Sequence, residues 1–234
     1  MQDFIKEYYS LITYSVEFLA VITGALLYKK YSKSPVKYVI YFLIYAFVVD
    51  LIGNYPRYLY NWDLYYIIEG TLIEKNYWWY NIFWCLGTSF FVYYINYEIV
   101  KKTSYKKVLR YGFIVYLILF ISDVIFNFEK LFVGNNIFLD VSTVWIVFVF
   151  TSIYFIEILQ SDRIMNFYRS VYFYFNSALL LWFLITTPLI FFEVYFSEAD
   201  WDFIILKWQI YLSVNVIFYI TLTFSLIFCQ PRTR

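Results

Sequence analysis

The chain contains no histidine, and cysteine, glycine, proline and charged residues are all scarce in it. Without histidine it lacks the commonest metal ligand and the side chain that most often moves protons near neutral pH. Its only cysteines, Cys85 and Cys229, provide no Cys/His cluster for zinc or haem. Nucleotide-binding and hydrolase motifs are also missing. We therefore expect no metal site, no cofactor and no enzymatic activity.

Charged residues make up 15% of the chain, against about 25% in an ordinary soluble domain. In their place, 63% of the residues are hydrophobic and 27% are aromatic. A bilayer core is about 30 Å thick, so a spanning helix needs roughly 20 apolar residues. The sequence predicts an all-α integral membrane bundle of seven transmembrane helices, which forms a single domain over residues 1–234. The predicted spans are about 8–28, 38–56, 77–97, 109–128, 138–158, 170–192 and 203–228.

The connections between these spans alternate in charge. Lysine and arginine gather in 29–37, 101–110, 163–169 and the tail, whereas the opposite connections 57–76 and 193–202 are acidic. The positive-inside bias places the N-terminus outside and the C-terminus in the cytoplasm. Topology and attraction to anionic lipids explain the basic loops, so we expect no nucleic-acid partner.

Two local features stand out in this topology. The connection 57–76 is long and rich in tyrosine and tryptophan, which predicts an ordered outer loop lying in the membrane interface. Pro188 falls inside the sixth span, and we expect it to kink that helix. Most of the 28 tyrosines are explained by anchoring at the interfaces.

Polar side chains at membrane depth are costly, so they normally face a protein interior or a water-filled cavity. Here they fall mainly in the outward half of the spans, and several share one helix face because they lie three, four or seven positions apart. We expect these faces to converge on a polar pocket that opens outward and binds a ligand or an ion. The candidate binding residues are Glu17, Asp50, Asn54, Asp123, Asn127, Asp140, Lys207, Tyr211 and Asn215. Ser10 and Thr13 continue the face of Glu17.

The charges of this predicted pocket do not balance. Lys207, with Arg57 at the rim, stands against four acidic residues of the candidate set. At least one carboxylate must therefore be protonated, bridged by water or matched by a cation from outside. Buried polar side chains also serve as interhelical contacts without binding anything, and that structural alternative stays open.

The topology is similar to that of microbial rhodopsins, but the residues of the retinal site do not match. Lys207 lies near the start of its span rather than at the middle, and the core of the third span carries no carboxylate. The opening YSVEFLAVITGALLYKKY and the content of Phe, Tyr, Ile, Lys and Asn resemble small seven-helix membrane proteins of AT-rich bacteria. That resemblance implies a bacterial cytoplasmic membrane and transfers no activity.

Three functions fit these observations. The first is a sensor or signalling subunit that acts through a membrane or cytoplasmic partner protein, because the predicted cytoplasmic loops are short. The second is a structural subunit of a larger membrane complex, with its polar faces satisfied by neighbouring chains. The third is a transporter of small solutes, ions or protons through the same carboxylates. Few polar groups in the inward half, few glycines and no matching broken helices favour the first two.

Overall fold

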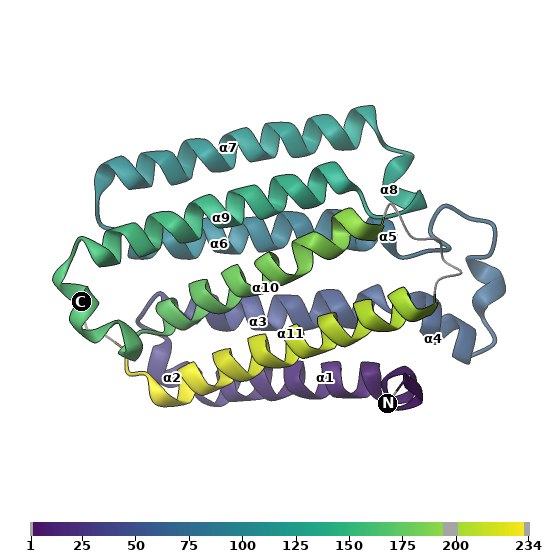
Figure 1. The fold of residues 1–234 in the computed structure, drawn as a ribbon, viewed down its shortest axis with the longest axis horizontal. Coiled ribbons are helices and arrows are strands. Elements are labelled where there is room, and N and C mark those ends of the chain that lie inside the picture. The colour runs from purple at the N-terminus through teal and green to yellow at the C-terminus, as the bar shows by residue number, and fades with distance from the viewer. Residues whose placement is uncertain (1, 194–200, 232–234) are drawn as a thin grey trace.

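The computed structural model describes residues 2–193 and 201–231, and every regular element in these two ranges is helical. Long helices run side by side along one axis and alternate in direction (Figure 1). The long helices are α1 (Gln2–Leu26), α3 (Val36–Gly53), α6 (Cys85–Ile99), α7 (Thr103–Phe126), α9 (Ile137–Leu159), α10 (Val171–Glu193) and α11 (Trp201–Phe228). The short elements are α2 (Tyr28–Tyr31), α4 (Tyr55–Asn61), η1 (Tyr65–Ile67), α5 (Tyr77–Trp79), η2 (Tyr80–Trp84), α8 (Lys130–Val133) and η3 (Asp162–Arg169).

Within the described part of the chain, six helices are long and apolar enough to cross a membrane. They are α1, α3, α7, α9, α10 and α11, and together they make this chain a multi-pass membrane protein in contact with lipid. The predicted span 77–97 is helical but interrupted. α5 continues into η2, a π-helical stretch, and then into α6. Its status as a seventh crossing therefore stays a prediction.

Three helix boundaries differ clearly from those expected. α1 begins at Gln2 rather than near residue 8. α7 begins at Thr103 rather than near 109, because Lys106, Lys107 and Arg110 are accommodated in its first turns. The guanidinium of Arg110 donates to the hydroxyl of Tyr97 at 2.6 Å, which keeps this charge at the helix surface. α3 ends at Gly53, and Pro56 then opens the separate helix α4.

The helices pack in two groups joined by α10 and by the contact between α3 and α6. α1 packs against α3 and α11, while α7 packs against α6 and α9 at the edge of the bundle (Figure 1). α10 contacts helices of both groups, namely α3, α9 and α11. Pro188 lies inside α10 and has no N–H, so the carbonyl of Leu184 lacks its helical hydrogen bond.

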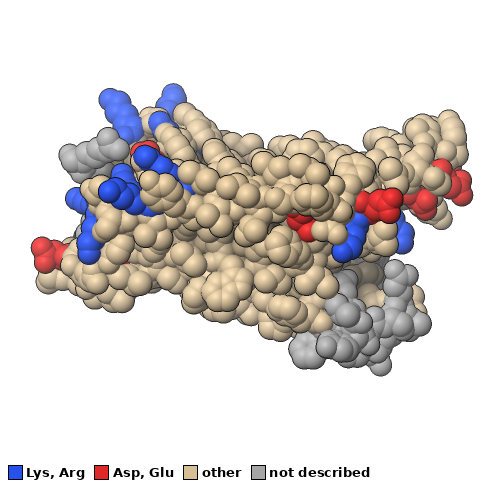
Figure 2. All heavy atoms as spheres, turned by 90° about the horizontal axis from the view of Figure 1, so that it is seen from above, with Lys and Arg blue, Asp and Glu red and all other residues tan. Residues whose placement is uncertain are grey.

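The charge pattern of the sequence is visible on the surface. Lysine and arginine gather at the end of the molecule that holds α2, and aspartate and glutamate are concentrated at the end that holds α4 (Figure 2). We call these the basic end and the acidic end. The middle of the face shown carries almost no charge, as expected for a surface that faces hydrocarbon.

The connection 57–76 lies at the acidic end and is ordered by its own hydrogen bonds. The side chain of Glu74 accepts from the backbone N–H of Gly70 at 3.0 Å and from the hydroxyl of Tyr65 at 3.1 Å. Tyr60 and Trp62 are exposed on it. Its order agrees with the expectation from the sequence, while its depth in a membrane interface stays a prediction.

Candidate functional site

A cavity of about 530 Å³ lies inside the acidic half of the bundle. Its walls come from both helix groups and from α10, and its rim includes loop residues such as Asn76 and Asn135. Asp50, Asn54, Asp140, Lys207, Tyr211 and Asn215 all line it. The structure thus brings six of the predicted site residues to one internal space.

Glu17 does not line this cavity itself but interacts with residues that do. Its side chain is 0% exposed, and neither carboxyl oxygen makes a hydrogen bond of standard geometry within the described chain. The carboxyl interacts electrostatically with Asp50 on α3 and with the hydroxyl of Tyr219 on α11, both of which line the cavity. One turn earlier on α1, the hydroxyl of Thr13 also lines the cavity, and it too lacks a hydrogen-bond partner among the described residues.

Nearer the rim, polar contacts fasten α1 to α3 and α4. The hydroxyl of Tyr14 accepts a short hydrogen bond from the side-chain amide of Asn54 and lies 3.3 Å from the hydroxyl of Tyr58. Arg57 donates to the hydroxyl of Ser10. Asn54 and Arg57 therefore have hydrogen-bond partners in this arrangement.

The π-helical stretch η2 turns three side chains toward the cavity: Tyr80, Asn81 and Trp84. A π-helical turn inserts an extra residue into a helix and is frequently found at functional sites. Tyr80 reaches α3 at Gly53, where an added Cβ would lie only 2.6 Å from the Tyr80 hydroxyl. The absence of a side chain at Gly53 thus lets Tyr80 approach and interact with Asp50.

Aromatic rings form one side of the cavity. The rings of Trp84 and Trp182 are 5.6 Å apart, and Tyr211 lies 6.3 Å from Trp182. The indole N–H of Trp182 donates to the side-chain oxygen of Asn215 at 2.7 Å, which links α10 to α11 and fixes the ring. The rings of Trp84, Trp182 and Tyr211 all line the cavity.

Asp140 and Lys207 complete the charged lining. Asp140 lies in the first turn of α9, behind the capping residue Asn136, so the positive end of the helix stabilises its negative charge. The thiol of Cys85 donates to the same carboxylate at 3.5 Å. Among the lining residues in the described chain, Lys207 is the only cationic one.

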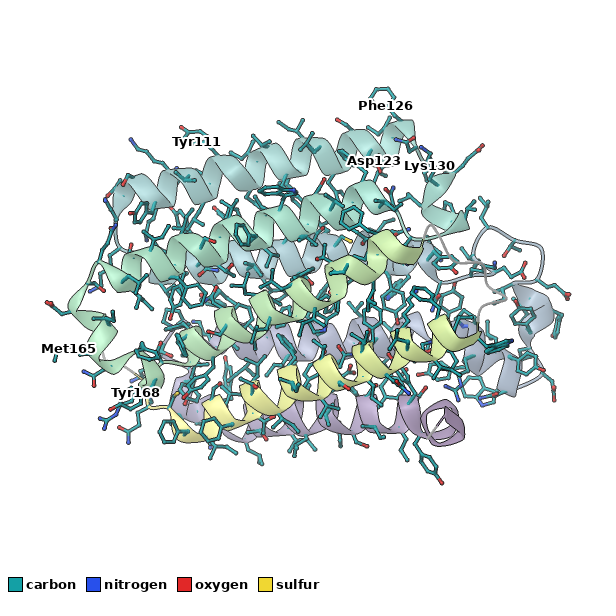
Figure 3. All side chains as sticks on the ribbon, in the orientation of Figure 1. Tyr111, Asp123, Phe126, Lys130, Met165 and Tyr168 are labelled. Carbon is teal, nitrogen blue, oxygen red and sulfur yellow. The ribbon has the colours of Figure 1, made fainter. Side chains whose placement is uncertain are left out.

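The structure places Asp123 and Asn127 outside the cavity. Figure 3 shows Asp123 at the acidic end of α7, beside Lys130 and away from the centre of the bundle. Its carboxylate accepts hydrogen bonds from Asn127 at 2.8 Å and from Asn136 at 2.6 Å, which ties α7 to the start of α9. The expectation that all the polar faces meet in one pocket fails for this pair, because the connection 127–136 folds back and satisfies them locally.

Below the cavity, the basic half is closed by packed side chains. Phe42 contacts Phe175 and Phe218 with ring separations of 5.4 and 6.2 Å, and all three are buried. We call these three rings the aromatic floor. Further toward the basic end, the side-chain amide of Asn96 donates to Asn176 at 3.0 Å between α6 and α10.

Several lining residues were not predicted from the sequence. Trp84, Trp182 and Trp208 are not among the predicted binding residues, and Tyr80 lies in a π-helical turn that sequence periodicity does not signal. The helical spacing of Trp182 with Thr186 on α10 is the one signal that was available for the aromatic wall.

The fold and the cavity together define a multi-pass helical membrane protein with an internal polar and aromatic site in one half of the bundle. Comparisons with protein-family models, with curated proteins and with solved structures find no match.

Proposed function

We propose that this protein is a membrane sensor that binds a small molecule in the cavity and transmits its occupancy to the opposite end of the bundle. The observation that carries the proposal is the contrast along α11. Lys207, Tyr211 and Asn215 of this helix line the cavity, and its last turn lies at the basic end. A cavity of about 530 Å³ is in the range of small-molecule sites.

The far end of α11 is held by the short helix α2. The ammonium group of Lys30 donates to the carbonyl of Cys229 at 2.6 Å, and the hydroxyl of Tyr31 donates to the same carbonyl at 2.6 Å and to that of Leu226 at 2.9 Å. These bonds satisfy terminal carbonyls of the helix. A shift of α11 on ligand binding would therefore change the surface around α2, where we place the contact with a membrane or cytoplasmic partner protein.

The orientation is part of the proposal. The basic end is proposed to face the cytoplasm, so that the cavity opens to the outside and the N-terminus is external. This requires seven crossings, with the interrupted run from Tyr77 to Ile99 as the third. The alternation of direction in Figure 1 and the charge segregation in Figure 2 support it. The membrane is proposed to be the cytoplasmic membrane of a bacterium, on the resemblance described above.

Transport and a purely structural role remain the alternatives. Transport needs access from both sides, and the aromatic floor of Phe42, Phe175 and Phe218 weighs against it because it separates the cavity from the basic end. A structural subunit would need no internal cavity.

A surrogate ligand tests the sensor without knowledge of the natural one. In a Cys85→Ser, Cys229→Ser background, Lys207→Cys is alkylated with a bulky maleimide that fills the cavity. Hydrogen exchange then reports on the backbone amides that follow Leu226, at the contact with α2. We expect exchange there to change on alkylation, because α11 is continuous between the two sites.

The matched control places the same adduct at the neighbouring position. Leu206 lies on α11 beside Lys207 and is half exposed on the outer surface of the bundle. Alkylation of Leu206→Cys should leave exchange at the basic end unchanged. An identical response to both adducts, or no response to the Lys207→Cys adduct, contradicts the proposed sensor function.

A further inference from the structure

Two acidic side chains, Glu17 and Asp50, interact at the cavity wall, and the carboxyl oxygens of Glu17 make no hydrogen bond of standard geometry within the described chain. Glu17 is fully buried, and Asp50 lies next to it on the cavity wall. The hydroxyl of Thr13 lines the same region and, like Glu17, has no hydrogen-bond partner within the described chain. Native proteins satisfy nearly all buried polar groups, so the oxygens of Glu17 and Thr13 need an explanation beyond the packing of the helices.

The lysine of the cavity does not satisfy this acidic pair. Lys207 is twelve positions before Tyr219 on α11, which corresponds to about 18 Å along a helix. Tyr219 interacts with Glu17, so the ammonium of Lys207 lies near the rim and the acidic pair lies at the inner end. Asp140 differs from the pair because the start of α9 stabilises its charge.

The aromatic wall supplies the second half of a recognition site. Trp84, Trp182 and Tyr211 line the cavity together, and Tyr80 and Tyr219 flank the acidic pair. Aromatic faces attract cations through the negative potential of their rings, most strongly when water is excluded. A buried acidic group enclosed by such rings is complementary to an ammonium group and not to an anion.

From this geometry we infer that the cavity binds a small organic cation, with its ammonium group at Asp50, whose carboxyl interacts with the buried Glu17, and its apolar body against Trp84 and Trp182. The hydroxyl of Thr13 is placed to accept a hydrogen bond from the same ammonium group. This inference rests on the proposed function, since it names the chemical class of the molecule that the sensor detects. A metal ion fits less well, because in the described chain no group of three or more acidic or cysteine side chains is arranged for one.

The test uses three probes of one shape and different charge. 2-Phenylethylammonium, uncharged 2-phenylethanol and phenylacetate are titrated by calorimetry into the full chain in nanodiscs of uncharged lipid, with empty nanodiscs as the blank. We expect the ammonium probe to bind about tenfold more tightly than the alcohol, and phenylacetate to bind more weakly than either. The ammonium probe should also slow thiol labelling of Asn215→Cys, which lines the same cavity.

Three neutralising variants locate the cation. Glu17→Gln and Asp50→Asn should each remove the preference for the ammonium probe over the alcohol. Asp123→Asn is the matched control, because this acidic residue lies at the same end of the bundle but outside the cavity. It should leave the preference unchanged. If Glu17→Gln does not fold, Asp50→Asn and Trp182→Leu give the same comparison, with weaker ammonium binding expected in both.

Two results overturn the inference. One is that the ammonium probe binds no more tightly than the alcohol, which includes the case in which no probe binds. The other is that its preference survives in both Glu17→Gln and Asp50→Asn. Neither result affects the surrogate-ligand experiment at Lys207→Cys. If alkylation of Lys207→Cys changes exchange at the basic end and the probes show no preference for a cation, the proposed sensor function holds and its ligand belongs to another chemical class.

Discussion

The acidic and basic halves of this bundle are built from the same long helices, but the space between the helices is filled differently in each half. In the basic half, the side-chain amide of Asn96 donates to Asn176, its oxygen has no hydrogen-bond partner among the described residues, and large rings fill the space between helices. In the acidic half, carboxyl groups, a π-helical turn and an internal cavity are kept together. Packed interiors stabilise, whereas cavities and unsatisfied polar groups cost stability. The cavity and its carboxyl groups therefore lower the stability of the acidic half, and this loss is what we expect at a binding site.

The largest expected effect comes from removing a ring of the aromatic floor. Phe175→Ala deletes a fully buried side chain in the basic half and should lower the free energy of unfolding by about 3 kcal/mol. Tyr211→Ala, in the wall of the existing cavity, should cost less than about 1 kcal/mol because it enlarges a space already present. Denaturant titration in mixed micelles measures both. Equal losses in the free energy of unfolding for the two variants would contradict the proposed difference in packing between the two halves.

A smaller effect is expected at the contact between α3 and η2. Gly53→Ala places a Cβ 2.6 Å from the hydroxyl of Tyr80, so Tyr80 must move away from Asp50. We expect a loss of about 1–2 kcal/mol in the free energy of unfolding. Gly134→Ala is the control, since an added Cβ there meets no atom within 4 Å. A loss at Gly134→Ala as large as that at Gly53→Ala would show that the close approach of Tyr80 is unimportant.

The interhelical amide pair gives the next prediction. Asn96→Ala removes the donor to Asn176, and hydrogen bonds of this kind are worth about 0.6 kcal/mol on average in membrane proteins. A double-mutant cycle with Asn176→Ala should return a coupling free energy of about that size. A coupling of zero would mean that the pair fills space without binding α6 to α10.

The smallest effect concerns the end of α11. Burial raises the pKa of the Cys229 thiol to about 11, although nearby Lys30 lowers it. The thiol is therefore protonated in the folded state at a pH where it ionises in the unfolded chain. Its contribution to stability is complete below about pH 9 and is lost as the pH rises toward 11. The pH dependence of unfolding should differ between wild type and Cys229→Ala only in that window. Superimposable curves between pH 9 and 11 would contradict a buried, protonated thiol.

Most of the helices could be predicted from the sequence, because an apolar run of about 20 residues in lipid satisfies its backbone hydrogen bonds by forming a helix. The polar faces of α1, α3 and α11 could also be predicted from the spacing of their residues. Thr13 and Glu17 share one side of α1, and Tyr211 and Asn215 share one side of α11. Asp123 shows where this reasoning stops. Its position along α7 matches the depth of the predicted pocket. Its hydrogen-bond partner Asn136, however, lies beyond the connection 127–136, and the path of that connection cannot be predicted from helical periodicity.

The aromatic part of the site was hidden for a different reason. In a chain with this many tyrosines and tryptophans, anchoring at an interface and lining a cavity leave the same pattern in the sequence. The π-helical turn at Tyr80–Trp84 shifts the face on which later residues of that run lie, and no residue type requires it. Only the packing of α5 and η2 against α3, with the indole of Trp79 donating to the carbonyl of Val49 at 2.8 Å, reveals it.

A cysteine scan along α11 tests the central claim most directly. Single cysteines replace Lys207, Tyr211, Asn215, Leu222 and Ser225 in a background without Cys85 and Cys229, and an impermeant maleimide is added to intact cells from outside. The account predicts labelling at 207, 211 and 215, which line the cavity, and none at 222 and 225, which are buried beyond the aromatic floor. Labelling at 222 and 225, or no labelling at 207, 211 and 215, would contradict an outward cavity closed at its inner end.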